Sequence, residues 1–101
     1  MKFDILEFKD KSTFKKHSFN SFPVSIGRRD DNDLVIDDIV VSRVHCAIYE
    51  DSGSIYVADL QSSNGTYLNK QKIENPQKVE DSDLLLVGKT FLGLKIIERS
   101  K

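Results

Sequence analysis

Short segments in which apolar and polar residues alternate follow one another along nearly the whole chain, and this period of two is typical of half-buried β-strands. Val44–Tyr49 is one example, with Val44, Cys46 and Ile48 on the expected buried face. A turn at Gly53 separates it from Ile55–Leu60, so the two segments are expected to form a hairpin. No segment carries the i, i+3, i+4, i+7 apolar spacing of an amphipathic helix. The pattern predicts an all-β protein with little or no helix.

The strand-like segments are short and regularly spaced. About ten of them follow one another at intervals of roughly 8–12 residues, which is typical of a β-sandwich or a β-barrel. They are residues 3–8, 13–19, 22–26, 34–36, 44–49, 55–60, 66–68, 72–73, 84–87 and 91–97. The chain has 101 residues and neither a repeat nor a linker-like stretch, so residues 1–101 are expected to form a single domain.

The composition argues against several classes of function. Lys and Arg number 15 and Asp and Glu number 16, and the resulting net charge of -1 gives no general attraction to nucleic acid or to an anionic membrane. Cys46 is the single cysteine, which excludes an internal disulfide and a cysteine-rich zinc site. No apolar run approaches the ~18 residues of a membrane-spanning helix, and the early charges of Lys2 and Asp4 are unlike a signal peptide. We expect a cytoplasmic protein without metal or cofactor.

Three polar clusters lie between the predicted strands, and each supplies hydrogen-bond donors. They are Gly27-Arg28, Ser42-Arg43-Val44-His45 and Ser62-Ser63-Asn64-Gly65-Thr66. Arginine offers a planar fork that suits phosphate oxygens, serine offers a short hydroxyl, and asparagine offers an amide that can bridge to a backbone. Gly27 and Gly65 are expected where the chain turns with positive φ. A small anion with several oxygens, such as phosphate, is the ligand that these residue types share.

Each cluster taken alone has a simpler explanation. A Gly-Arg pair is usually a strand end, and Asn64-Gly65 is first of all a hairpin-turn signal. His45 is expected to be a hydrogen-bonded structural residue, and Cys46 a small buried apolar residue. Asn64-Gly65-Thr66 also matches the N-glycosylation pattern, but nothing in the sequence suggests secretion. The clusters gain weight from their order and spacing.

In that order, Gly27-Arg28, Ser42-x-x-His45 and Asn64-Gly65-Thr66 resemble the forkhead-associated (FHA) domain family. The neighbouring residues agree with the resemblance, which runs from about Val24 to Ile97: Asp59-Leu60-Gln61-Ser62-Ser63 before Asn64, Asn69 after it, and Asp81-Ser82-Asp83 followed by Leu84–Gly88. Residues 1–23 would supply the first strands of the same sandwich. The departures are small, because Lys70 and Ser82 stand where the family commonly has glycine and Cys46 stands where it has alanine.

The resemblance implies an FHA-type β-sandwich of about eleven strands with its binding loops at one end. It also implies that the protein binds phosphothreonine in a partner protein. The residues expected to bind the phosphopeptide are Arg28 and Ser42 on the phosphate, Arg43 and Ser63 through side chain or backbone, and Asn64 on the peptide main chain. The residues expected to support the site are Gly27, His45, Gly65 and Thr66.

Two other functions are open at this stage. Ser42, His45 and Asp59 include the residue types of a nucleophile, a base and an orienting acid. No Gly-x-Ser-x-Gly elbow surrounds Ser42, and no phosphate-binding loop for nucleotides is present, so we expect no enzyme activity. A phosphate-independent protein-interaction module on the same sandwich is the second alternative.

The partner itself is not identified by the sequence beyond its chemistry. It would be a protein or peptide phosphorylated by a Ser/Thr kinase, with no nucleic acid or membrane involved. Variable loops such as Asp30–Asp33 would contact the residues that flank the phosphothreonine. The acidic residues of this region would favour basic or neutral flanking residues, although such a run is commonly just a solvated loop.

Overall fold

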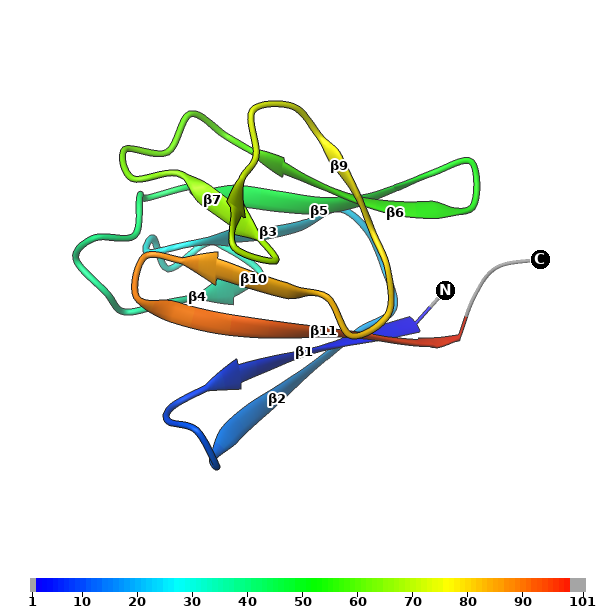
Figure 1. The fold of residues 1–101 in the computed structure, drawn as a ribbon, viewed down its shortest axis with the longest axis horizontal. Helices are drawn as coiled ribbons and strands as arrows, with labels where there is room; N and C mark the ends of the chain where they lie inside the picture. Colours follow the sequence, from blue (N-terminus) through cyan, green and yellow to red (C-terminus); the bar gives the residue numbers. More distant parts are fainter. Residues whose placement is uncertain (1, 99–101) are drawn as a thin grey trace.

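In the computed structural model, which describes residues 2–98, the chain forms eleven strands and no helix (Figure 1). The strands are β1 (Lys2–Phe8), β2 (Phe14–Phe19), β3 (Val24–Gly27), β4 (Leu34–Val35), β5 (Cys46–Asp51), β6 (Ser54–Asp59), β7 (Thr66–Leu68), β8 (Gln71–Lys72), β9 (Gln77–Val79), β10 (Leu84–Val87) and β11 (Thr90–Glu98). The all-β prediction is confirmed, and every predicted segment overlaps a strand. Strand β9 was not predicted, because Val79 is the one apolar residue of this short edge strand.

The strands form two sheets that face each other. The six-stranded sheet has the order β2-β1-β11-β10-β7-β8, and the five-stranded sheet has the order β4-β3-β5-β6-β9. The first two strands enter the sandwich through the antiparallel pairing of β1 with β11. The predicted hairpin across Gly53 is present, since β5 and β6 pair antiparallel from Cys46–Asp59 to Asp51–Ser54. The β4–β5, β6–β7 and β10–β11 connections gather at the left end of Figure 1.

Alternate residues of both sheets form the core between them. Ile5, Ile48, Val57, Leu85 and Leu92 are fully buried, one from each of five strands. At roughly 1.5–3 kcal/mol for each buried aliphatic side chain, this core is the main stabilising contribution to the sandwich. The core holds the two sheets rigidly enough for the loops at one end to keep a defined geometry.

The predicted inward face of residues 44–49 is wrong at its start. The strand begins at Cys46, two residues later than predicted, and Val44 is only partly buried while His45 beside it is fully buried. The reason is that Val44 and His45 still belong to the preceding loop, where hydrogen bonding turns His45 inward. Cys46 is buried as expected, and burial raises the pKa of its thiol to about 12, which leaves it unreactive at neutral pH.

Two of the departures from the family pattern have a backbone consequence. Lys70 and Ser82, where glycine is common, adopt positive φ angles of 76° and 71°. An L-residue in the left-handed region is strained by about 1–2 kcal/mol, whereas glycine is not.

We expect Ser82→Gly to stabilise the protein. The relief of backbone strain exceeds the roughly 0.4–1 kcal/mol that glycine costs through the unfolded chain, which leaves a net gain of about 0.5 kcal/mol. Thermal unfolding should show a melting temperature higher by roughly 2–4 °C. The matched control is Ser21→Gly, because Ser21 is exposed and lies outside the left-handed region, so the same change there should lower the melting temperature. Equal losses in the two variants would contradict the strain at Ser82.

Candidate functional site

Hydrogen bonds join the three polar clusters at one end of the sandwich. The backbone N–H of Arg28 donates to the carbonyl of Ser42 at 3.0 Å, and Arg28 Nε donates to the carbonyl of Val41, also at 3.0 Å. The backbone N–H of Ser63 donates to Ser42 Oγ at 3.0 Å. Asn64 Nδ2 donates to the carbonyl of Val40 at 2.9 Å. The structure therefore brings Arg28, Ser42, Ser63 and Asn64 together from three loops.

The donors left over at this junction point to an anionic ligand. Arg28 is exposed and uses only its Nε and its backbone N–H, so the two terminal nitrogens of its guanidinium remain available. Ser42 Oγ accepts a hydrogen bond from Ser63, which leaves its own O–H to donate. The backbone N–H of Ser63 is already used in that bond, so a contact from Ser63 to a ligand must come from its exposed side chain.

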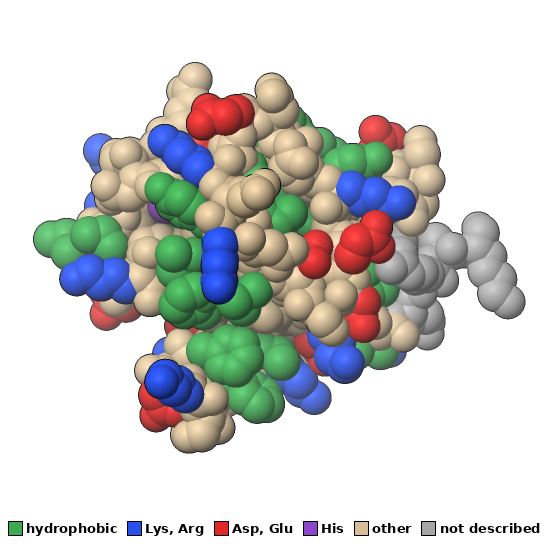
Figure 2. Space-filling view, viewed as in Figure 1, with side chains coloured by type: hydrophobic (Ala, Val, Ile, Leu, Met, Phe, Trp, Pro, Cys, Tyr) green, Lys and Arg blue, Asp and Glu red, His purple; other side chains and the backbone are tan. Residues whose placement is uncertain are grey.

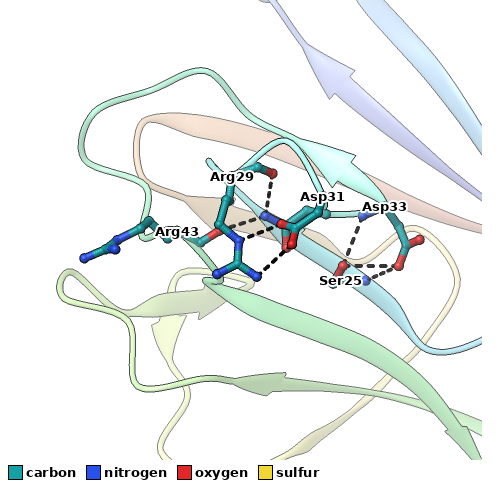
Figure 3. Close-up of polar contacts among 6 residues, drawn as sticks. Ser25, Arg29, Asp31, Asp33 and Arg43 are labelled. Atoms are coloured by element: carbon teal, nitrogen blue, oxygen red, sulfur yellow. Dashed lines mark hydrogen bonds and ion pairs between the residues drawn. The ribbon is translucent and has the colours of Figure 1, made fainter.

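Arg43 contributes to the loop through its backbone and to the surface through its side chain. Its carbonyl accepts the Nδ2–H of Asn32 at 2.7 Å and the backbone N–H of Arg29 at 3.1 Å. Figure 3 shows the guanidinium of Arg43 extending away from this network, whereas that of Arg29 turns back onto Asp31. The guanidinium of Arg29 is therefore paired with Asp31, whereas that of Arg43 is available to a ligand.

Asn32 helps to build the site and was not among the predicted site residues. Its side chain is 9% exposed and donates to the carbonyls of both Arg29 and Arg43. Asp33, from the same acidic run, accepts hydrogen bonds from the backbone and side chain of Ser25 (Figure 3). Part of the predicted solvated loop is therefore structural. The one signal in the sequence is that Asn32 lies among aspartates. Its amide can donate hydrogen bonds to backbone carbonyls, which a carboxylate cannot do.

The prediction of a positive φ at Gly27 is wrong, and glycine is needed there for another reason. Gly27 is the last residue of β3 and does not adopt a positive φ. A Cβ atom at this position would collide with the carbonyl of Arg43 and lie 2.8 Å from Asn32 Nδ2. Gly27 thus allows the β4–β5 loop to lie directly against β3. Gly65 does turn with positive φ, at 86°, as predicted.

His45 joins two of the loops from the interior. Its ring is fully buried, with Nδ1 accepting the backbone N–H of Ser42 at 3.0 Å and Nε2 lying 2.8 Å from the carbonyl of Gly65. Since Nδ1 accepts, the ring must carry its proton on Nε2, which donates to Gly65. The imidazole therefore links the loop of Ser42 to the loop of Asn64.

Asp59 organises the β6–β7 loop from its base. Its carboxylate accepts hydrogen bonds from the hydroxyl and backbone N–H of Ser62 and from Thr66 Oγ1, the last at 2.7 Å. Burial by itself raises the pKa of Asp59, but these hydrogen bonds bring it below the ordinary value of 3.8. Ser62 Oγ in turn accepts the backbone N–H of Gly65. Thr66 acts on the site through Asp59, and the carboxylate fixes the turn that presents Asn64.

We expect the stability that Asp59 provides to disappear in acid. Because its pKa is lower in the folded state, its contribution is complete above the unfolded pKa of about 4 and is lost as the pH falls through the folded value. The free energies of unfolding of the wild type and Asp59→Asn should differ most near pH 6. The difference should shrink toward pH 3, by at most about 1.4 kcal/mol per pH unit. A difference that stayed constant across this range would show that the charge is not what matters.

The geometry argues against the catalytic alternative. A Ser-His-Asp triad needs the imidazole between the serine hydroxyl and the carboxylate. Here the ring nitrogens of His45 are bonded to backbone groups of Ser42 and Gly65, and Asp59 is bonded to Ser62 and Thr66. Among residues 2–98 there is no cluster of three or more His, Cys, Asp or Glu side chains placed to hold a metal ion.

Comparison with known proteins identifies the family. The family model of the FHA domain matches residues 24–88, which is more than half of the chain, so this protein belongs to the FHA domain family. The match spans the strands and loops that build the site, from the start of β3 to the end of β10.

The similar proteins include sequence relatives and solved structures. The FHA domain-containing protein FhaB of Mycolicibacterium smegmatis is 40% identical over 73 residues, which are 72% of this chain and 47% of that protein. The chain thus spans about half the length of the curated relatives it matches. The FHA domain of CT664 from Chlamydia trachomatis has a TM-score of 0.88 at 22% identity and covers 97% of this chain and 100% of that one, so it shows the same fold. Mycobacterium tuberculosis EmbR in complex with a low-affinity phosphopeptide has a TM-score of 0.82 at 26% identity, over 92% of this chain and 24% of that one.

None of the described residues forms a helix long and apolar enough to cross a membrane.

Proposed function

We propose that this domain binds phosphothreonine in a partner protein. The observation that carries the proposal is the junction of Arg28 and Ser42, where the guanidinium and the hydroxyl come from different loops and are tied together by the bond from Arg28 N–H to the Ser42 carbonyl. A phosphate carries about -1.5 to -2 charges at neutral pH and three acceptor oxygens, so it can use both donors at once. The similar EmbR structure, which holds a phosphopeptide, supports the same chemistry.

The roles of the surrounding residues follow from their exposure. Arg28 and Ser42 bind the phosphate oxygens, and Ser63 adds its hydroxyl from the β6–β7 loop. Arg43 follows Ser42 in the same loop and presents an open guanidinium (Figure 3). Asn64 already donates one amide hydrogen to the carbonyl of Val40, so its oxygen and second hydrogen are available to the main chain of the peptide.

The proposed partner is the product of a Ser/Thr kinase. The proposal places no further demand on the partner than this phosphorylation, and we take the cytoplasm as the compartment of the encounter. The domain acts as a binding module and not as an enzyme, in agreement with its family and with the use of His45 as a structural link. Residues 1–101 act as one FHA domain in this proposal. The protein's place within a signalling pathway depends on the partner that carries the phosphothreonine.

A degenerate peptide library with a fixed phosphothreonine tests the proposal directly. The domain should retain phosphorylated peptides and release them after phosphatase treatment. The same library with unphosphorylated threonine is the control. Equal retention of the two libraries would favour the alternative of a phosphate-independent interaction module.

We expect phosphothreonine to bind more tightly than phosphoserine in otherwise identical peptides. Both offer the same oxygens, so Arg28 and Ser42 cannot distinguish them, and the difference lies in one methyl group. A missing methyl in a fitted pocket costs about 1–3 kcal/mol, and the branched side chain loses less freedom on binding. Titration calorimetry at one salt concentration should show a roughly 10- to 100-fold preference. Equal affinities would mean that no pocket encloses the methyl group.

A further inference from the structure

The outer face of the six-stranded sheet carries an apolar patch that the phosphate site does not use. Strand register places its residues side by side, since Phe8 pairs with Phe14, and Leu86 pairs with both Phe91 and Tyr67. The residues of this outer patch are Phe8, Phe14, Tyr67, Leu84, Leu86 and Phe91. Phe14 and Phe91 are 52% and 45% exposed. Figure 2 shows hydrophobic side chains gathered over β10, β11 and β1, with Lys or Arg side chains beside them.

The outer patch contains two hollows, and Leu84 and Phe91 line both of them. One hollow, of about 460 Å³, lies between the β1–β2 turn and the β10–β11 hairpin, with Phe8 on its far wall. The other, of about 310 Å³, lies toward β7, with Tyr67 and Leu86 on its walls. Two apolar side chains of a bound segment would fit on either side of Phe91.

The charges around the hollows are predominantly basic. Lys9, Lys11 and Lys89 line the first hollow and Lys70 lines the second. Asp10 also lines the first hollow and keeps its negative charge, with its carboxylate accepting the backbone N–H groups of Ser12 and Thr13. Lys9 Nζ is paired with Glu7 at 3.0 Å, so the net positive charge of the rim comes from Lys11, Lys70 and Lys89. The patch therefore offers an apolar floor with a basic rim. In a chain whose net charge is -1, this local excess of lysine is a feature of the surface and not of the composition.

We propose that the outer patch docks an acidic segment of a partner protein that carries two or more large apolar side chains. Charge complementarity decides the occupant, because the basic rim attracts carboxylates while the floor buries apolar groups. A second copy of this chain would bring one lysine rim against another, and like charges at an interface are unfavourable. The hollows favour a peptide segment over a membrane surface, which has no side chains to insert.

The patch lies next to the phosphate site but shares no residue with it. The backbone N–H of Lys89 in the β10–β11 turn donates to Asp38 Oδ2 at 3.1 Å, and Asp38 Oδ1 accepts the N–H of Val40 in the β4–β5 loop. One partner could therefore occupy both surfaces at once. A partner that binds both surfaces would gain combined affinity without any new contact in the phosphate site, because its second binding event becomes intramolecular.

The probe for the patch is a synthetic unphosphorylated peptide in which leucine alternates with glutamate. We expect it to bind the domain and to shift the backbone amide NMR signals of Phe91, Leu84 and Lys89. Two matched peptides, one with lysine in place of glutamate and one with serine in place of leucine, should bind at least about 10-fold more weakly. Excess phosphothreonine peptide should leave the binding intact, so the outcome does not depend on the proposed function.

Two variants locate the binding. Phe91→Ser should weaken the leucine-glutamate peptide by about 10-fold or more, whereas Ile97→Ser, on the same strand and 52% exposed, should not. Lys11→Glu should weaken it about 2- to 10-fold, and Lys2→Glu, at the opposite end of β1, should have little effect. Retained phosphothreonine binding and an unchanged melting temperature would show that the Phe91 variant is folded.

Three results would overturn the proposal. One is equal binding of the leucine-glutamate and leucine-lysine peptides. The second is sedimentation with phosphatidylserine vesicles in the absence of any peptide binding, since this would make the patch a membrane contact. The third is a dimer of the unliganded domain that Phe91→Ser dissociates, since this would assign the patch to a second copy of the chain.

Discussion

Arg28→Ala should reduce phosphothreonine-peptide affinity by about 10- to 150-fold while the domain stays folded. Arg28 is exposed at the end of β3, and its Nε is held by the carbonyl of Val41, so its terminal nitrogens have a fixed direction before any ligand arrives. A charge-assisted hydrogen bond contributes about 1.5–3 kcal/mol, and this gives the expected range. Titration calorimetry measures the affinity, and thermal unfolding checks the fold. Arg28→Lys should retain part of the binding, because it keeps the charge and loses the fork.

Arg29→Ala is the matched control for this prediction. The two arginines are adjacent and exposed, but the guanidinium of Arg29 is paired with Asp31 at 2.7 and 2.9 Å (Figure 3). An exposed pair of this kind contributes about 0–1 kcal/mol to stability, so neither the fold nor the binding should change much. Loss of binding in both variants, or in neither, would remove Arg28 from its proposed role.

The strands were predictable because burial imposes a pattern that the sequence displays. In a sandwich, each strand faces the core on one side, so alternation identifies the strand without knowledge of its partners. Strand β9 was not predicted, because three residues with one apolar side chain are too few to show an alternation of apolar and polar residues. Part of the outer patch has a signal in the sequence. All four residues of Leu84–Val87 are apolar, so this strand presents apolar side chains to both faces of its sheet.

The loops were predictable in their residue types but not in their geometry. Motif order identified Arg28, Ser42 and Asn64 as neighbours, whereas nothing local to Asn32 shows that it reaches the carbonyl of Arg43. The need for glycine at position 27 likewise arises from the approach of Arg43, a residue of another loop. Such contacts depend on how two loops are placed by the sandwich, and a sequence pattern reports only one segment at a time. The ligand contacts of Arg28, Ser42, Arg43, Ser63 and Asn64 stay predictions.

His45→Ala should destabilise the domain strongly, because one buried ring satisfies two groups on different loops. The variant leaves the N–H of Ser42 without its acceptor and the carbonyl of Gly65 without its donor. Each unsatisfied group costs about 1–3 kcal/mol, so the total is roughly 2–6 kcal/mol out of the 5–15 kcal/mol that is usual for a domain. The melting temperature should fall by at least about 8 °C. Thermal unfolding followed by circular dichroism measures it.

Two amide substitutions separate the halves of this link. Asparagine places a polar atom near the position of Nδ1 and can accept from Ser42, whereas glutamine places one near Nε2 and can donate to Gly65. His45→Asn and His45→Gln should each recover part of the stability that His45→Ala loses. Binding at a temperature where all variants are folded should be weakest where Ser42 lacks its partner, because that loop presents the phosphate-binding hydroxyl. A variant with the native melting temperature and no phosphopeptide binding would instead make His45 a direct ligand.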